Sequence, residues 1–338
     1  MLLLGIMKKI LTFITAALLA LSFISCGKKI DTSTWLSNME DAKTAAKAEN
    51  KKIFLFFSDD EGDEKSAKLK QNLFNTEDFI KTYTENYVLV NLDFSNSRFD
   101  SDQEHLKQDY RHFDLYAVQG TPYFLILSAE GYVITKIAFE ADADIETARL
   151  TFGEVADTIE SFEEKLAKTK SGSKEERMKA INDIVDGTDP AISYHLAPLN
   201  ELYISLDKNN ESGESLKHLI ALTYAKATDY FLEGEPEKGS DEFAKIVDNK
   251  ILSEEDKQMA WYTAGFLLTQ SGSRNYAKIK EYYQNAYDIA PESELGNSLK
   301  ATMNYLQMLI DGEGDDGISY EPQGKDESEE NSSDNSIE

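Results

Sequence analysis

Cysteine is almost absent from this chain, because Cys26 is the only one among 338 residues. A single cysteine forms no intramolecular disulfide and supplies no dithiol that cycles between oxidised and reduced states. Basic residues are also scarce, since 35 lysines and arginines stand against 62 aspartates and glutamates, for a formal net charge of −27. A nucleic-acid surface needs clustered cations, so this balance argues against a nucleic-acid partner.

The single cysteine follows a segment with the layout of a secretory signal. Met7–Cys26 opens with two lysines, continues as an apolar run too short for a comfortable membrane span, and has a small residue before the cysteine. The residues before it, Phe23-Ile24-Ser25, resemble a bacterial lipobox, with phenylalanine where leucine is usual. We therefore expect residues 1–26 to be a lipoprotein signal peptide and Cys26 to be lipidated. An ordinary signal peptide that contains a cysteine is the alternative.

Beyond the signal, the sequence divides into three segments. Residues 31–167 alternate strand and helix patterns, with buried runs of strand type at Lys52–Phe57 and Tyr87–Phe94. A polar stretch follows, and residues 174–311 show helical patterns only. Residues 312–338 are acidic and lack apolar periodicity, which predicts a disordered tail.

Several markers recur at set spacings in the first segment. A helix pattern led by Trp35 precedes the apolar run Lys52–Phe57, and Leu69 and Phe74 follow at fixed offsets. Farther on, Gly120-Thr121-Pro122 leads into another strand pattern. Together these features resemble the thioredoxin-like family, in particular its bacterial periplasmic branch. The resemblance implies an α/β thioredoxin-like domain over residues 31–167.

The resemblance also places the family's site residues. Asp63 and Ser66 stand where the two cysteines of the CxxC motif are expected. Because neither side chain replaces a thiolate in disulfide exchange, we expect no redox catalysis and no cofactor. Thr121 and Pro122 match the family's cis-proline loop, where the backbone of Thr121 would pair with an extended peptide. The alternative is that Pro122 only shapes the end of a strand.

The acidic turn at Ser58–Glu64 raises the question of a metal site. Its spacing fails the calcium-loop pattern, which needs alternating acids, a glycine at the sixth position and a glutamate at the twelfth. Asp63 and Glu64 are better explained by the favourable interaction of negative charge with a helix N-terminus. The four histidines show no paired ligand spacing, so we expect no metal site; they are His105, His112, His195 and His218.

The helical segment resembles a tetratricopeptide-like repeat. Small, aromatic and proline residues fall at the offsets of the repeat's second helix, namely Ile279, Tyr283, Ala286 and Pro291. The preceding segment, residues 221–249, shows the same pattern of small, aromatic and proline residues. In such a stack the first helices of successive hairpins line a concave face, which makes Tyr230 and Tyr262 candidate groove residues. A plain helical bundle without a groove is the alternative.

These observations predict a non-catalytic lipoprotein of the cell envelope, held to a membrane on the periplasmic side by lipid on Cys26. Its thioredoxin-like domain and helical repeats would bind or scaffold other proteins. One alternative is an enzyme with a non-thiol site in the cleft between the domains, for which Asp63, Asp93 and Asp114 are the obvious carboxylates. Another is a purely structural role, with the two folds acting as spacers for the acidic tail.

Overall fold

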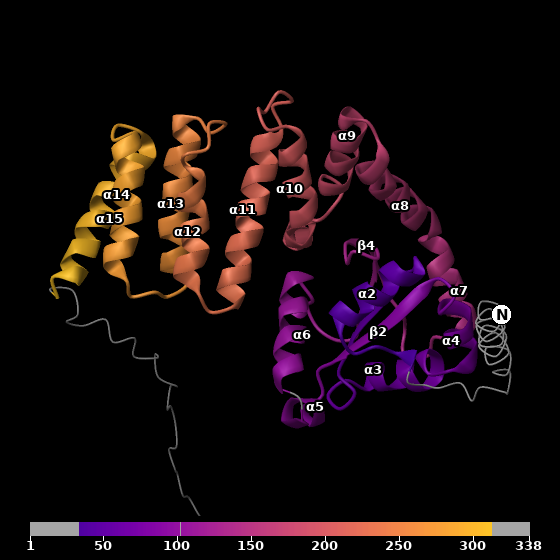
Figure 1. Ribbon diagram of the computed structural model, residues 1–338. Coiled ribbons are helices and arrows are strands. Elements are labelled where there is room, and N and C mark those ends of the chain that lie inside the picture. Colours follow the sequence, from indigo (N-terminus) through magenta and orange to yellow (C-terminus); the bar gives the residue numbers. More distant parts are fainter. Residues whose placement is uncertain (1–33, 102, 313–338) are drawn as a thin grey trace, which may run out of the picture. The chain divides into compact units, whose positions relative to one another are not determined.

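The computed structural model describes residues 34–101 and 103–312 of the chain (Figure 1). It divides into two compact units, one that extends to Ala225 and one that begins at Lys226. The expected signal peptide with Cys26 and the expected acidic tail lie outside the described residues. Within the described ranges, no helix is both long enough and apolar enough to cross a membrane.

The first unit is built on a four-stranded sheet. Its strands are β1 (Lys52–Ser58), β2 (Tyr87–Asp93), β3 (Tyr123–Leu127) and β4 (Val133–Ile137), in the order β2-β1-β3-β4. β1 pairs with β2 in parallel, whereas β3 pairs antiparallel with both β1 and β4. This arrangement confirms the expected thioredoxin-like fold, and it leaves β4 at one edge of the sheet.

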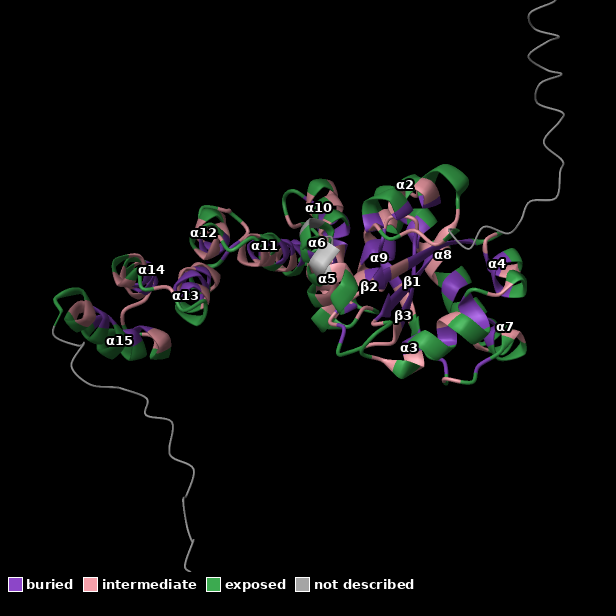
Figure 2. Ribbon diagram, turned by 90° about the horizontal axis from the view of Figure 1, so that it is seen from below, coloured by how far each residue is buried: buried purple, intermediate pink, exposed green. Residues whose placement is uncertain are grey.

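The apolar sequence of β1 explains its central position. Successive strand residues point to opposite faces, so a strand covered on both faces needs a continuous apolar run. Phe54 and Phe56 enter one hydrophobic core, whereas Ile53, Leu55 and Phe57 enter the other. Figure 2 shows the strands as the most continuously buried part of this unit.

Helices cover both faces of the sheet. One core is completed by residues from α3 (Glu64–Leu69), the π-helical turn η2 (Lys70–Phe74), α4 (Glu77–Tyr83) and α7 (Ile145–Glu154). The other core receives residues from α2 (Met39–Glu49) and from α6 (Gln103–Leu115), which follows the short α5 (Asn96–Ser101). The predicted cap of α4 is present, because the Thr76 hydroxyl accepts the Phe79 N–H at 3.3 Å.

The first helix starts later than the sequence predicts. We expected it to begin at Trp35, but α2 begins at Met39, and Asn38 caps it by accepting two backbone N–H groups of the first turn. The Trp35 ring packs against the first core instead, and its Nε1–H donates to the Phe74 carbonyl at 3.4 Å. Packing of the Trp35 ring in the core therefore stabilises the chain more than a further turn at the start of α2 would.

The first unit continues beyond the expected end of the thioredoxin-like segment. The helix expected over 144–166 is two helices that meet at Val155, α7 and α8 (Ala156–Ser171). They are followed by α9 (Lys174–Val185), the 3-10 helix η3 (Pro190–Leu196), α10 (Ala197–Leu206) and α11 (Ser215–Leu232). Tyr132 at the start of the β4 hairpin arm and Leu166 of α8 share a hydrophobic cluster with residues of α9, η3 and α10.

The second unit is helical throughout its described part. It contains the end of α11, then α12 (Pro236–Ile246), α13 (Glu254–Gln270), α14 (Tyr276–Ile289) and α15 (Glu294–Ile310). These helices share one core in which small residues meet aromatic rings. A Cβ atom added at Gly265 would lie 2.6 Å from the Tyr283 ring, so the closeness of α13 and α14 depends on that glycine.

Candidate functional site

The loop after β1 holds Asp63 and Ser66, the two residues that we expect at the positions of the cysteine pair. Asp63 is the N-cap of α3, and its carboxylate accepts the backbone N–H groups of Lys65 and Ser66 at 3.1 Å each. The Ser66 hydroxyl donates to the same carboxylate at 2.5 Å and is fully buried with its residue. The two side chains therefore contact each other as part of a helix cap; that they occupy the positions of a cysteine pair stays a prediction.

The other acids of this loop are engaged in local interactions. The Asp59 carboxylate accepts the N–H groups of Glu61 and Gly62, at 3.1 and 2.7 Å. Asp60 pairs with Lys70 at 2.6 Å, and the Lys70 ammonium lies 5.6 Å from the centre of the Phe56 ring. Hydrogen bonds of the loop and two ion pairs, Asp60 with Lys70 and Glu64 with Lys68, thus hold the acidic turn.

The three carboxylates considered for a non-thiol enzyme do not form one group. Asp93 at the end of β2 accepts the Asp60 N–H at 3.3 Å and the Ser95 hydroxyl at 2.7 Å. Asp114 is exposed near the end of α6. Throughout residues 34–101 and 103–312, no three His, Cys, Asp or Glu side chains are arranged to hold a metal ion.

The cis-proline loop has the geometry that the resemblance implies. The peptide bond between Thr121 and Pro122 is cis, and β3 begins at the next residue, Tyr123. Both Thr121 and Pro122 are half-buried. Whether the Thr121 backbone pairs with a peptide remains a prediction.

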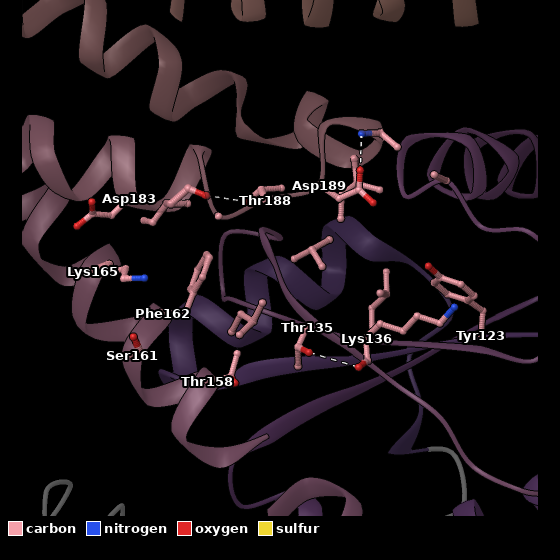
Figure 3. Close-up of a pocket in the computed structure, with 18 of the residues that line it drawn as sticks. Tyr123, Thr135, Lys136, Thr158, Ser161, Phe162, Lys165, Asp183, Thr188 and Asp189 are labelled. Carbon is pink, nitrogen blue, oxygen red and sulfur yellow. Dashed lines mark hydrogen bonds between the residues drawn. The ribbon is translucent and has the colours of Figure 1, made fainter. Parts of the chain in front are cut away.

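A cavity of about 790 Å³ borders β4, and sequence reasoning did not find it (Figure 3). Residues 133–136 of β4 all line it, although neighbouring side chains of a strand point to opposite faces. Val133 belongs to one core of the sheet, and Ile134 packs against the other. The cavity therefore borders both sides of β4, and through Tyr123 and Leu125 it also reaches the adjoining strand β3.

Three further segments complete the cavity, and one of them runs from Ala117 and Gln119 through the cis-proline loop to Tyr123 and Leu125. One face of α8 supplies polar and apolar side chains, and the chain from the end of α9 into η3 supplies the wall opposite them (Figure 3). The lining residues of these two segments are Asp157, Thr158, Ser161, Phe162, Lys165, Asp183, Ile184, Gly187, Thr188, Asp189, Ala191 and Ile192. No motif marks this site, because its walls come from segments far apart in the sequence.

His195 of η3 covers the beginning of the β4 edge. Its Nε2 atom accepts the backbone N–H of Val133 at 3.0 Å, so the ring is neutral with its proton on Nδ1. Burial lowers the pKa of His195 to about 4, which keeps it neutral at pH 7. Sequence reasoning treated this histidine only as a possible ligand, whereas it anchors η3 to the sheet.

His218 of α11 has a structural setting as well. Its Nδ1 and Nε2 atoms each lie 2.7 Å from an amide oxygen, of Asn200 and Asn182 respectively. The ring stacks on Tyr203 with the two centroids 3.7 Å apart, and burial lowers its pKa to about 4. The cluster links α9, α10 and α11.

The two candidate groove residues of the helical region are half-buried. Tyr230 lies near the end of α11, with the Lys238 ammonium 6.0 Å from its ring centre. Tyr262 of α13 stacks between Phe266 and Tyr283, at 6.0 and 5.8 Å between centroids. Phe266 is 42% exposed, so this stack reaches from the core to the surface of the unit.

Comparisons with known proteins agree with this architecture. Residues 39–150 match the family model of a thioredoxin-like domain, and residues 215–311 match a model described as an uncharacterised protein C-terminal domain. A solved structure titled DsbH Oxidoreductase is similar at 16% identity, over 39% of this chain and 92% of that chain, with a TM-score of 0.34. No curated protein matches. The chain thus carries a thioredoxin-like domain followed by a helical C-terminal region.

Proposed function

We propose that this chain is a non-catalytic lipoprotein of the cell envelope that binds or scaffolds other proteins. The observation that carries the proposal is the pair Asp63 and Ser66, which cap a helix where a redox protein of this fold needs two thiols. Disulfide exchange needs a thiolate to attack and a second thiol to resolve the mixed disulfide. The only sulfhydryl of the chain is Cys26, which we assign to the lipid anchor.

The proposed binding role has support in both parts of the chain. The loop at Thr121 and Pro122 is half-buried just before β3, and the resemblance to the thioredoxin-like family implies that its backbone pairs with extended peptides. In the helical region, Met259 and Phe266 are 50% and 42% exposed on α13, on either side of Tyr262. Exposed apolar and aromatic side chains on one helix are typical of protein-binding surfaces.

An insulin-reduction assay tests the non-catalytic assignment. We expect the purified chain to give no turnover above the thiol-only background, measured beside an active thioredoxin at matched concentration. A Cys26→Ala variant serves as the control, because any activity that depends on Cys26 would disappear in it. Turnover by the wild-type chain that persists in this variant would contradict the assignment.

A labelling experiment tests the anchor. Cells that express the wild-type chain or the Cys26→Ala variant are grown with labelled palmitate. We expect label on the wild-type protein and its recovery in the detergent phase of a phase-separation assay, with neither in the variant. Unlabelled wild-type protein in the aqueous phase would contradict lipid anchoring at Cys26.

A further inference from the structure

We propose that the cavity beside β4 binds an extended polypeptide segment that adds to the sheet as a fifth strand, with an acidic side chain near Lys165. The cavity borders the cis-proline loop, because Gln119 and Tyr123 on either side of that loop line it, but the proposed strand pairs with β4 and not with Thr121. The inference rests on the proposed function only in taking the ligand to be a polypeptide.

The first argument is the hydrogen-bonding character of the cavity wall. An edge strand presents alternate N–H and C=O groups that lack a ladder partner, and an added strand satisfies them. β4 is the edge strand on this side, and residues 133–136 line the cavity from both of its faces. The Val133 N–H is already bonded to His195, so we expect pairing over the following residues.

The second argument is that the space suits a short peptide. A volume of about 790 Å³ lies within the usual range of roughly 300–1,000 Å³ for ligand sites. The five residues of β4 span about 17 Å, at roughly 3.3 Å per residue. Apolar side chains of an added strand would meet Phe162, Ile184 and Ile192, which line the walls.

The third argument is the charge at the cavity wall. Lys165 is half-buried, its ammonium group points into the cavity in Figure 3, and no carboxylate of the described residues pairs with it. Two of the other charged lining residues already have partners. The Lys136 ammonium lies 3.9 Å from the centre of the Tyr123 ring, and Asp183 pairs with Lys179 at 2.6 Å.

Two lining carboxylates remain to be placed. Asp189 accepts the Ala191 N–H at 2.9 Å, and Asp157 lies in the first turn of α8, where the helix dipole favours negative charge. Asp157 is two turns of the helix away from Lys165. An acidic side chain is therefore complementary to the Lys165 end of the cavity and not to the Asp157 end.

The test uses the full chain and labelled synthetic octapeptides of alternating valine and threonine that carry one aspartate or, for comparison, one lysine. We expect the aspartate peptides to bind by fluorescence anisotropy and to slow amide hydrogen exchange in residues 133–137. N-methylation of alternate peptide nitrogens should weaken binding at least about tenfold, because it removes the strand's hydrogen-bond donors.

Matched variants locate the site. Ser161 and Glu164 are both exposed on α8, but only Ser161 lines the cavity. Ser161→Trp should therefore weaken binding about tenfold or more, whereas Glu164→Trp should leave it unchanged. Lys165→Glu should reverse the preference for aspartate over lysine, whereas Lys168→Glu on the outer face should not. The melting temperature of each variant shows that it is folded.

Several results would overturn the proposal. No binding by any octapeptide would do so, as would equal binding of the N-methylated peptides, which would indicate side-chain contacts without strand pairing. Binding by Ser161→Trp as tight as binding by the wild type would place the peptide elsewhere. Slower amide exchange found only in residues other than 133–137 would do the same. Insulin reduction by the wild-type chain would contradict the proposed function. The peptide-binding and hydrogen-exchange results would still test the β4 site by themselves.

Discussion

The loop after β1 and the edge of β4 belong to the same compact unit, and they use their polar groups in opposite ways. In the loop, Asp63 and Asp59 accept backbone N–H groups of their own turn, and Ser66 is buried against Asp63. At the β4 edge, residues 133–136 line an open cavity, and the Lys165 ammonium points into it. The position that carries chemistry in the family is therefore closed here, and the free hydrogen-bonding capacity lies elsewhere.

The loop after β1 also shows how a thioredoxin-like fold can be held in place without a cysteine pair. A thioredoxin-like domain needs the helix after β1 to begin at a fixed place, and a carboxylate N-cap provides this without sulfur. The aromatic core beneath the loop remains dense, with Phe56 and Phe124 stacked at 4.8 Å between centroids. Packing and capping thus maintain the architecture independently of redox function.

The largest effect is expected from restoring the cysteine pair. Because the Asp63 carboxylate and the Ser66 hydroxyl already meet, Asp63→Cys with Ser66→Cys in a Cys26→Ala background should form an intramolecular disulfide on oxidation. Thiol alkylation followed by mass spectrometry counts the free thiols before and after oxidation. Two free thiols that persist under oxidising conditions would show that the register of the loop is wrong.

The β4 edge should respond to acid through His195. Its pKa of about 4 in the folded chain is below the ordinary 6.5, so protons bind the unfolded chain more readily and stability falls as the pH drops from about 6.5 towards 4. At pH 5 this histidine should account for a loss on the order of 2 kcal/mol relative to pH 7. His195→Gln keeps an acceptor for the Val133 N–H but does not titrate.

The measurement is urea denaturation of wild type and His195→Gln at pH 7 and pH 5. The variant should lose less of its free energy of unfolding between the two values than the wild type loses. His112 and His218 also have pKa values lowered to about 4 by burial, so part of the acid sensitivity should remain. Equal losses in both proteins would contradict the role given to His195.

The loop should respond to removal of its cap. Asp63→Ala takes away the acceptor of two backbone N–H groups and of the buried Ser66 hydroxyl, so we expect a loss of about 1 kcal/mol in the free energy of unfolding. Glu64→Ala is the control, because Glu64 is exposed and pairs only with Lys68. Equal midpoints for the two variants in urea would argue against the capping role.

The smallest contrast is expected between two lysines. Lys70 of the loop has Asp60 and the Phe56 ring as partners, so Lys70→Ala should cost up to about 1 kcal/mol. Lys165 has no ion-pair partner among the described residues, so Lys165→Ala should change stability by less than about 0.5 kcal/mol. A larger loss in the free energy of unfolding for Lys165→Ala would mean that this lysine stabilises the fold and is not available for a ligand.

Much of the fold follows from local sequence patterns. The four strands, the Thr76 cap and the start of α9 depend on apolar runs and on neighbouring polar residues, which a sequence shows directly. The start of α2 was less predictable, because Trp35 contributes more in the aromatic core than in a helix. The break at Val155 between α7 and α8 comes two residues after Gly153, and a single glycine inside a helical pattern does not by itself end the helix.

The candidate sites divide in the same way. Asp63 and Ser66 were found through the spacing of Leu69 and Phe74, which runs along α3 and the π-helical turn η2 that follows it. The β4 cavity depends on how α8 and η3 pack against an edge strand, and its walls are contributed by residues 117–136 and 157–192. Contacts across such separations leave no spacing pattern, so only the folded chain shows them.

The comparison between the loop and the edge is tested most directly by amide hydrogen exchange of the full chain, with and without the aspartate octapeptide. The account predicts slower exchange in residues 133–137 on peptide addition, with residues 59–66 unchanged. Slower exchange in residues 59–66 or around Thr121, with β4 unchanged, would contradict it and assign peptide binding to the family's usual groove.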